Sequence, residues 1–169
     1  MIYPFFTAAA FFLLLLQTAV MPHYTTFTGF YDLLVPLVIY LGFIRSAREG
    51  AGLILMMGVM SDAVSGGFFG SYLTAYIWIF LMVRWLITFL HVKHTALIPF
   101  VVAAGVLMQN CIFLLVFAIL DPDGTPGADS TRIIVHQVLW AVFTGPLLLM
   151  LFSSVLRKWN GWLRLLFAG

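Results

Sequence analysis

The stretch GVMSDAVSGGFFG, residues 58–70, joins two long apolar segments and sets how they pack together. Gly58, Asp62, Gly66 and Gly70 recur in it at four-residue intervals. If the stretch is helical, these residues line one face as a small-residue groove that holds a carboxylate. If Gly66 and Gly67 end the helix, Asp62 lies in its last turns and the glycines form a tight reversal. In both conformations an acid at membrane depth needs a structural or functional reason.

The composition is that of an integral membrane protein. Of 169 residues, 63% are hydrophobic and only 8% are charged, whereas soluble domains carry about 25% charged residues. The backbone in a lipid core must satisfy its own hydrogen bonds, and the long apolar segments therefore predict a single all-α domain covering residues 1–169. A net charge of +2 is too small to indicate a nucleic-acid surface.

Six apolar segments predict six transmembrane helices in one bundle, at about residues 2–21, 32–44, 51–64, 71–90, 96–120 and 133–156. The third segment reaches only about 21 Å, which is less than the roughly 30 Å of a hydrocarbon core. Its helix therefore either begins earlier, in the basic turn after the second segment, or stops partway. Residues 157–169 mix cations with tryptophans and predict an interfacial tail.

The distribution of charge predicts the topology. Six spans place both termini on one side, and the cations assigned to that side are Arg45, Arg48, Lys93, Arg157, Lys158 and Arg164. The opposite side holds Arg132 and the three aspartates of the loop at residues 121–132. Because cations concentrate on the cytoplasmic side, we expect both termini in the cytoplasm and the acidic loop outside.

Asp62 and Arg84 are the two charges predicted to lie inside the membrane, at similar depths. An unpaired charge there costs about 2.5–3.5 kcal/mol. An ion pair would relieve this cost, as would Arg84 extending to the inner surface while Asp62 meets outer water. A partner-helix contact or a ligand-binding cavity are the functional alternatives. Gln109 and Asn110 predict hydrogen bonds across helices.

The sequence contains no pattern typical of a catalytic, cofactor or metal site. The serines lack a histidine and an acid at similar depth, and neither a His-x-x-x-His spacing nor a phosphate-binding loop is present. Cys111 is the single cysteine, so an intrachain disulfide is impossible and a packing role is expected. We therefore expect a protein that is not an enzyme. His136 and Gln137 are expected near the outer end of the last span, within reach of water.

The layout and one motif resemble the rod shape-determining MreD family. The motif is Gly58-x-x-x-Asp62-x-x-Ser65-Gly66-x-x-x-Gly70, followed by a long span. The resemblance implies a non-enzymatic bacterial inner-membrane protein of the cell-elongation machinery. It implies work with the scaffold MreC, the actin-like filament MreB, and a shape-type polymerase with its penicillin-binding partner, which together direct peptidoglycan synthesis.

The resemblance also supplies an alternative function. The family's fold looks like the substrate-binding subunits of energy-coupling-factor vitamin transporters. Such a subunit needs a pocket of convergent polar groups near the outer face, to which Asp62, Ser65, His136 and Gln137 could contribute. Under the scaffold interpretation, the small-residue face contacts a partner's transmembrane helix, and Gly66 and Gly70 could also serve a homodimer. Membrane lipid is the remaining expected partner.

Overall fold

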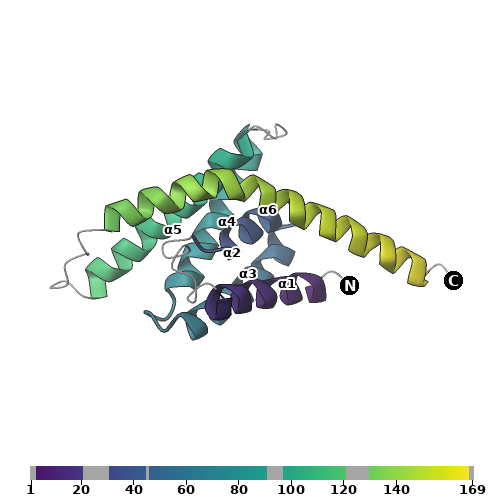
Figure 1. Ribbon diagram of the computed structural model, residues 1–169, viewed down its shortest axis with the longest axis horizontal. Helices are drawn as coiled ribbons and strands as arrows, with labels where there is room; N and C mark the ends of the chain where they lie inside the picture. Colours follow the sequence, from purple (N-terminus) through teal and green to yellow (C-terminus); the bar gives the residue numbers. More distant parts are fainter. Residues whose placement is uncertain (1–2, 21–30, 45, 91–96, 121–129, 168–169) are drawn as a thin grey trace.

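The computed structural model describes residues 3–20, 31–44, 46–90, 97–120 and 130–167. Within these residues the chain is all-helical and contains no strand. The elements are α1 (Tyr3–Leu15), the π-helical turn η1 (Leu16–Val20), α2 (Leu34–Ile44), α3 (Ala47–Ser65), α4 (Ser71–Leu90), α5 (Ile98–Leu120) and α6 (Ser130–Phe167). Figure 1 shows α6 arching over the other helices.

The short helix α2 is the centre of the fold. Every residue from Leu34 to Gly42 is buried, and the five other α-helices within the described residues all contact α2. Its sequence is apolar on every face, which is the composition of a helix surrounded by protein or lipid. With 11 residues it extends only about 16 Å, which is short of the roughly 30 Å hydrocarbon thickness. The other helices therefore pack around α2.

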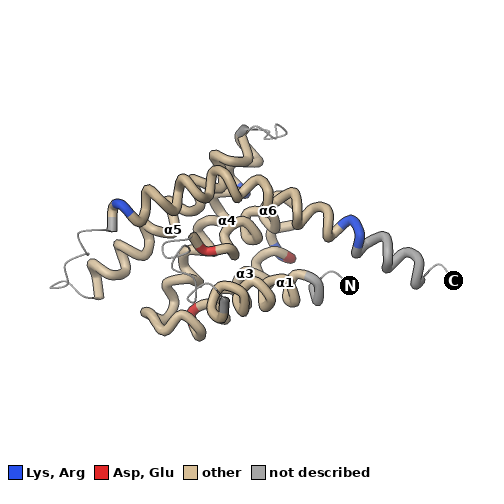
Figure 2. Tube along the Cα trace, viewed as in Figure 1, with Lys and Arg blue, Asp and Glu red and all other residues tan. Residues whose placement is uncertain are grey.

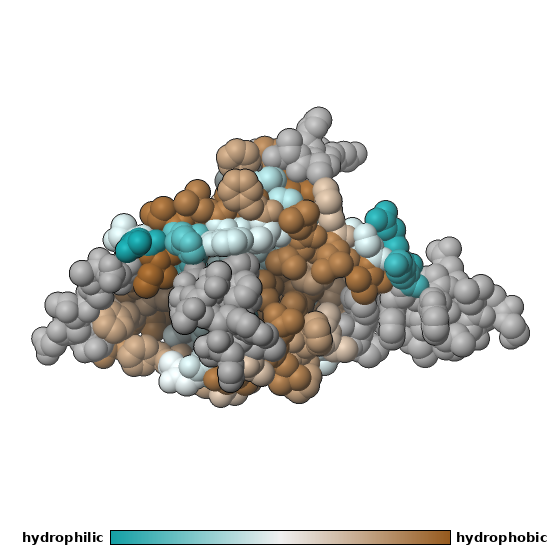
Figure 3. All heavy atoms as spheres, in the orientation of Figure 1, coloured by the Kyte–Doolittle hydropathy of each residue, from teal (hydrophilic) through white to brown (hydrophobic). Residues whose placement is uncertain are grey.

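Among the residues that the structure describes, three helices are long and apolar enough to cross a membrane: Ser71–Phe89 in α4, Ile98–Leu120 in α5 and Thr131–Lys158 in α6. Phe6–Ala19 and Leu34–Ile44 are apolar but shorter. Large apolar side chains point outward, and Phe100 and Phe143 are 72% and 73% exposed. Hydrophobic residues cover much of the coloured surface in Figure 3. Because water would oppose such exposure, this surface fits a lipid environment.

Helix bounds differ from the sequence prediction chiefly in α2, α3 and α6. α3 begins at Ala47, so its 19 residues extend about 28 Å; of the two possibilities for the short third segment, the earlier start is the one adopted. α2 begins at Leu34 because Asp32 precedes the helix and accepts the Leu34 N–H. α6 continues as a helix beyond the expected end of its span to Phe167, and contains Pro146. Figure 1 shows α6 bent near its middle, as expected where proline removes a backbone donor.

The stretch at residues 58–70 forms a helical hairpin rather than one continuous helix. α3 ends at Ser65, and Gly66 follows with a left-handed φ of 66°, a conformation that glycine adopts without a Cβ penalty. A Cβ added at Gly58 would lie 2.6 Å from the Cα atom of Leu73, whereas one added at Gly66 or Gly70 would meet nothing within 4 Å. Close packing in this stretch therefore depends on Gly58. Of the two conformations left open by the sequence, the structure adopts the helix that ends at the glycines, with Asp62 in its last turn.

Replacing Gly58 with alanine tests this close approach of α3 and α4. The added methyl group would overlap the backbone of Leu73, and we expect Gly58→Ala to lower the free energy of unfolding by about 1–3 kcal/mol. Gly52→Ala is the matched control because it lies in the same helix with open space around it; we expect it to be neutral or stabilising by up to about 1 kcal/mol. Thermal unfolding in detergent measures both, and a Gly58→Ala protein as stable as Gly52→Ala would contradict the packing.

Candidate functional site

The Asp32 carboxylate is the most densely hydrogen-bonded side chain in the described interior. It is buried, at 8% exposure. Its Oδ1 atom accepts the Leu34 backbone N–H at 2.9 Å. Its Oδ2 atom accepts the Tyr76 hydroxyl and the Gln109 Nε2 at 2.9 Å. The Gln17 side chain of η1 lies near the same carboxyl group. Donors from α2, α4 and α5 thus converge on one carboxyl group.

The cluster extends to α3 through the Tyr76 hydroxyl. Tyr76 is fully buried, and Ser61 is 3% exposed; their hydroxyl oxygens lie 3.2 Å apart. Because the Tyr76 proton goes to Asp32, the Ser61 hydroxyl is the donor in this pair. We call Gln17, Asp32, Ser61, Tyr76 and Gln109 the polar core. Within the described residues, the buried Oε1 atom of Gln17 has no hydrogen-bond partner.

Asp62 serves a different purpose, at the start of α4. Its Oδ1 atom accepts the Tyr72 backbone N–H at 2.9 Å and its Oδ2 atom accepts that of Leu73 at 3.1 Å. The first N–H groups of a helix lack partners within the helix, and a negative charge there also interacts favourably with the helix dipole. Asp62 therefore caps α4 from the neighbouring helix α3. The Ser65 hydroxyl lies in the last turn of α3 and bonds the Asp62 carbonyl at 3.4 Å.

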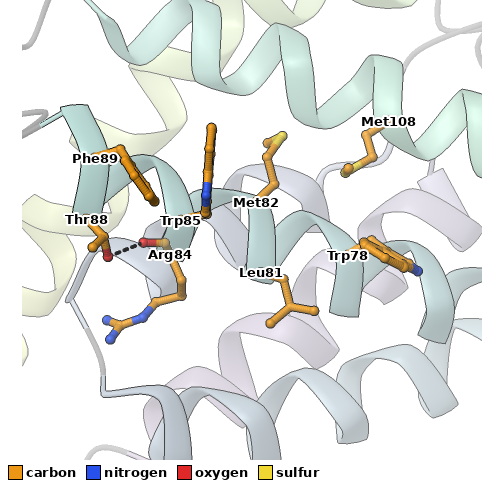
Figure 4. Close-up of a pocket in the computed structure, with 8 residues that line it drawn as sticks. All are labelled: Trp78, Leu81, Met82, Arg84, Trp85, Thr88, Phe89 and Met108. Carbon is orange, nitrogen blue, oxygen red and sulfur yellow. Dashed lines mark hydrogen bonds between the residues drawn. The ribbon is translucent and has the colours of Figure 1, made fainter.

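The structure does not bring Asp62 and Arg84 together. Arg84 follows Tyr72 by 12 positions in α4, which is about 18 Å along the helix. Arg84 instead lines a groove of about 630 Å³, whose other lining residues are Trp78, Leu81, Met82, Trp85, Thr88, Phe89 and Met108. In Figure 4 the Arg84 side chain points away from Met108. The groove is predominantly apolar and runs along the outward side of α4.

The neighbouring amides of α5 face two different helices. Gln109 bonds Asp32, while the Nδ2 atom of Asn110 donates to the Gln137 Oε1 of α6 at 2.9 Å. The prediction that these amides form hydrogen bonds across helices is confirmed. His136 is exposed, and its Nε2 atom accepts the Trp140 Nε1 at 3.1 Å. Gln137 is therefore part of the helix packing, whereas His136 is on the surface.

A second buried contact fixes the bend of α6 against the residue that precedes Asp32. The Thr144 hydroxyl donates to the Trp140 carbonyl at 2.7 Å. The Tyr31 hydroxyl, 2.7 Å away, is therefore the donor to Thr144. A Cβ added at the adjacent Gly145 would lie 2.6 Å from Val102 of α5, so α6 packs closely against α5 beside this contact.

The sequence identified the hairpin residues but missed the polar core. The second predicted span begins at about residue 32, and Asp32 does lie just before α2, but its buried partners were not foreseen. The available signal was the presence of Gln17, Asp32 and Gln109 in separate apolar segments, since polar groups in membrane helices tend to meet. Figure 2 shows how sparse and separated the charged residues are.

The polar core offers hydrogen-bond donors and acceptors, so it can bind and orient another polar group through hydrogen bonds. Its oxygen and amide groups come from five segments of the chain. No group of three or more His, Cys, Asp or Glu side chains in the described ranges is placed to hold a metal ion. Comparisons of the chain with protein-family models, with curated proteins and with solved structures find no match.

Removing the Tyr76 hydroxyl tests the energetic weight of the polar core. Tyr76→Phe deletes one hydrogen-bond partner of a buried acid and leaves the ring in place, so we expect a loss of about 1–3 kcal/mol in the free energy of unfolding. Tyr72→Phe is the matched control, one turn earlier on α4, because the described residues give its hydroxyl no hydrogen-bond partner. We expect the control to change stability by less than about 0.5 kcal/mol. Equal effects in denaturant-induced unfolding would refute the assignment.

Proposed function

We propose that this chain is a non-enzymatic component of the bacterial cell-elongation machinery, with six transmembrane helices in the inner membrane and both termini in the cytoplasm. In this role it binds the scaffold MreC and helps to regulate peptidoglycan synthesis together with MreB, the shape-type polymerase and its penicillin-binding partner. The single observation that carries the proposal is the α3–α4 hairpin, because it is built from the residues of the motif that resembles MreD.

The hairpin gives the motif residues a structural use. Gly58 allows the α3 backbone to approach Leu73, and Asp62 caps α4 through Tyr72 and Leu73. Gly66 provides the left-handed turn between the helices. A motif used to hold two helices in a fixed relation suits an adaptor whose surface must keep its shape. This structural use of the motif requires no catalytic activity.

The polar groups of the described interior also favour an adaptor. The Asp32 carboxylate is occupied by donors from its own protein, and the Asp62 carboxylate is occupied by backbone amides. Binding a substrate at either acid would require breaking these bonds. A partner would instead meet the outward surface, which is rich in apolar side chains.

The groove along α4 is the surface we assign to the transmembrane helix of MreC. Gly58 is packed inside the hairpin, so the small-residue face expected to meet a partner is already used by α4. The groove presents Trp78 and Trp85, which are 53% and 58% exposed. Large aromatic side chains of this kind supply much of the energy at protein interfaces.

The proposed topology has support from the ends of the chain. α1 begins and α6 ends toward the same end of the molecule (Figure 1). An even number of crossings produces this arrangement. The cationic turns predicted from the sequence assign that end to the cytoplasm.

Co-purification in detergent from cells that make both this protein and MreC tests the proposal. We expect a stable complex, and we expect the double variant Trp78→Ala/Trp85→Ala to lose it because the groove loses its two largest side chains. Phe143→Ala is the matched control, since Phe143 is equally outward-facing but lies on α6. No complex, with both proteins folded, would overturn the proposed function. A complex that survives the groove variant would move the contact to another surface, and self-association alone would indicate a homodimer.

A second candidate, the substrate-binding subunit of an energy-coupling-factor vitamin transporter, is favoured by one observation. Polar side chains from several helices converge on Asp32, and the buried Gln17 Oε1 has no partner among the described residues. Thermal-shift measurements with a panel of vitamins distinguish the two functions. Stabilisation that Gln109→Leu abolishes would favour the transporter subunit, whereas an adaptor shows no shift.

A further inference from the structure

The end of α6 extends beyond the part of that helix able to cross a membrane. α6 has 38 residues and is therefore about 57 Å long, compared with roughly 30 Å of hydrocarbon. Its apolar stretch runs from Thr131 to Lys158, but the helix continues to Phe167. Figure 1 shows this last part reaching past the other helices. The end of α6 therefore contacts surroundings other than the helix bundle.

The residues that extend beyond the bundle carry only positive charge. Residues 157–169 contain Arg157, Lys158 and Arg164 and no acidic residue. Arg157 and Lys158 are exposed. The Arg157 Nη2 lies 3.4 Å from the Ser154 hydroxyl, a contact that uses one of the five N–H donors of a guanidinium.

The sequence of this segment is amphipathic at helical spacing. Polar residues and glycine recur three or four positions apart, at Arg157, Asn160, Gly161 and Arg164. Apolar residues recur with the same spacing at Trp159, Trp162, Leu163 and Leu166. Positions with this spacing share one side of a helix. A basic side opposite a side with tryptophans is typical of helices that lie in a membrane interface.

We propose that residues 157–167 form a binding surface for anionic phospholipid headgroups. The apolar side enters the boundary between headgroups and acyl chains, and the cations contact headgroup phosphates. Continuity with the membrane-crossing part of α6 places this segment where the headgroups begin. The excess of cations selects anionic over zwitterionic lipid, because each Lys or Arg near an anionic surface adds attraction. The surface is independent of which protein partner the bundle binds.

Cysteine accessibility in the full-length protein tests the proposed surface. Cys111→Ser removes the single native cysteine, and Leu163→Cys or Asn160→Cys then reports the apolar or the polar side. The protein is reconstituted in vesicles of phosphatidylcholine, alone or mixed with phosphatidylglycerol, and treated with a water-soluble maleimide. We expect labelling at position 163 to slow several-fold in the mixed vesicles, while labelling at position 160 stays fast.

Charge variants separate lipid recognition from other causes of protection. Arg157→Gln/Lys158→Gln/Arg164→Gln should remove the effect of phosphatidylglycerol at position 163. Arg48→Gln/Arg132→Gln, which removes cations elsewhere, should leave it unchanged. Fast labelling at position 163 in both kinds of vesicle would overturn the proposal, because the segment would then lie in water. Equal protection in both would also overturn it, because a contact other than anionic lipid would then cover the apolar side.

Discussion

The Asp32 side chain is an acid buried inside an apolar bundle, and it requires hydrogen-bond partners from several helices to lie where they do. A buried acidic group is tolerated only when its hydrogen-bonding capacity is filled. Here the donors come from Leu34, Tyr76 and Gln109, and Ser61 joins through Tyr76. Displacing any of these helices would leave buried polar groups unpaired, each at a cost of about 1–3 kcal/mol. This requirement gives the short helix α2 a fixed position among its neighbours, which apolar contacts alone would define less sharply.

Asp62, the second buried acid, likewise requires hydrogen-bond donors at fixed positions, and these lie in the first turn of α4. Asp62 holds the Tyr72 and Leu73 amides, and the Tyr76 hydroxyl, one turn later, reaches Asp32. The start of α4 therefore joins the hairpin to the polar core, and Gly58 allows the close approach that both contacts need. Since both acids have hydrogen-bond partners inside the bundle, the proposed interactions with lipid and with a partner protein fall to the outward aromatic surface. This division between a polar interior and an apolar exterior is the physical basis of the adaptor function proposed above.

The apolar segments predicted the helices, and the composition predicted a membrane protein, because both depend on segment length and polarity. The hydrogen bonds of Gln109 and Asn110 were also predictable, since amides in apolar helices seek partners. The central position of α2 was not predictable, because lipid is as apolar as a protein core, and an all-apolar helix suits both. The partners of Asp32 lie at positions 17, 76 and 109, and no local pattern links them. At Gly66 the sequence allowed either a continuous helix or a helix end, because glycine accepts both a helical and a left-handed φ.

The most direct test of the account is the energetic coupling between Asp32 and Tyr76. A double-mutant cycle uses the wild type, Asp32→Asn, Tyr76→Phe and the double variant, with the free energy of unfolding measured for each in detergent. If the carboxylate and the hydroxyl act as one hydrogen-bonded unit, the two changes are non-additive, with a coupling of about 1.5–3 kcal/mol. Effects that add to within about 0.5 kcal/mol would contradict the claim that the Asp32 carboxylate holds the bundle together.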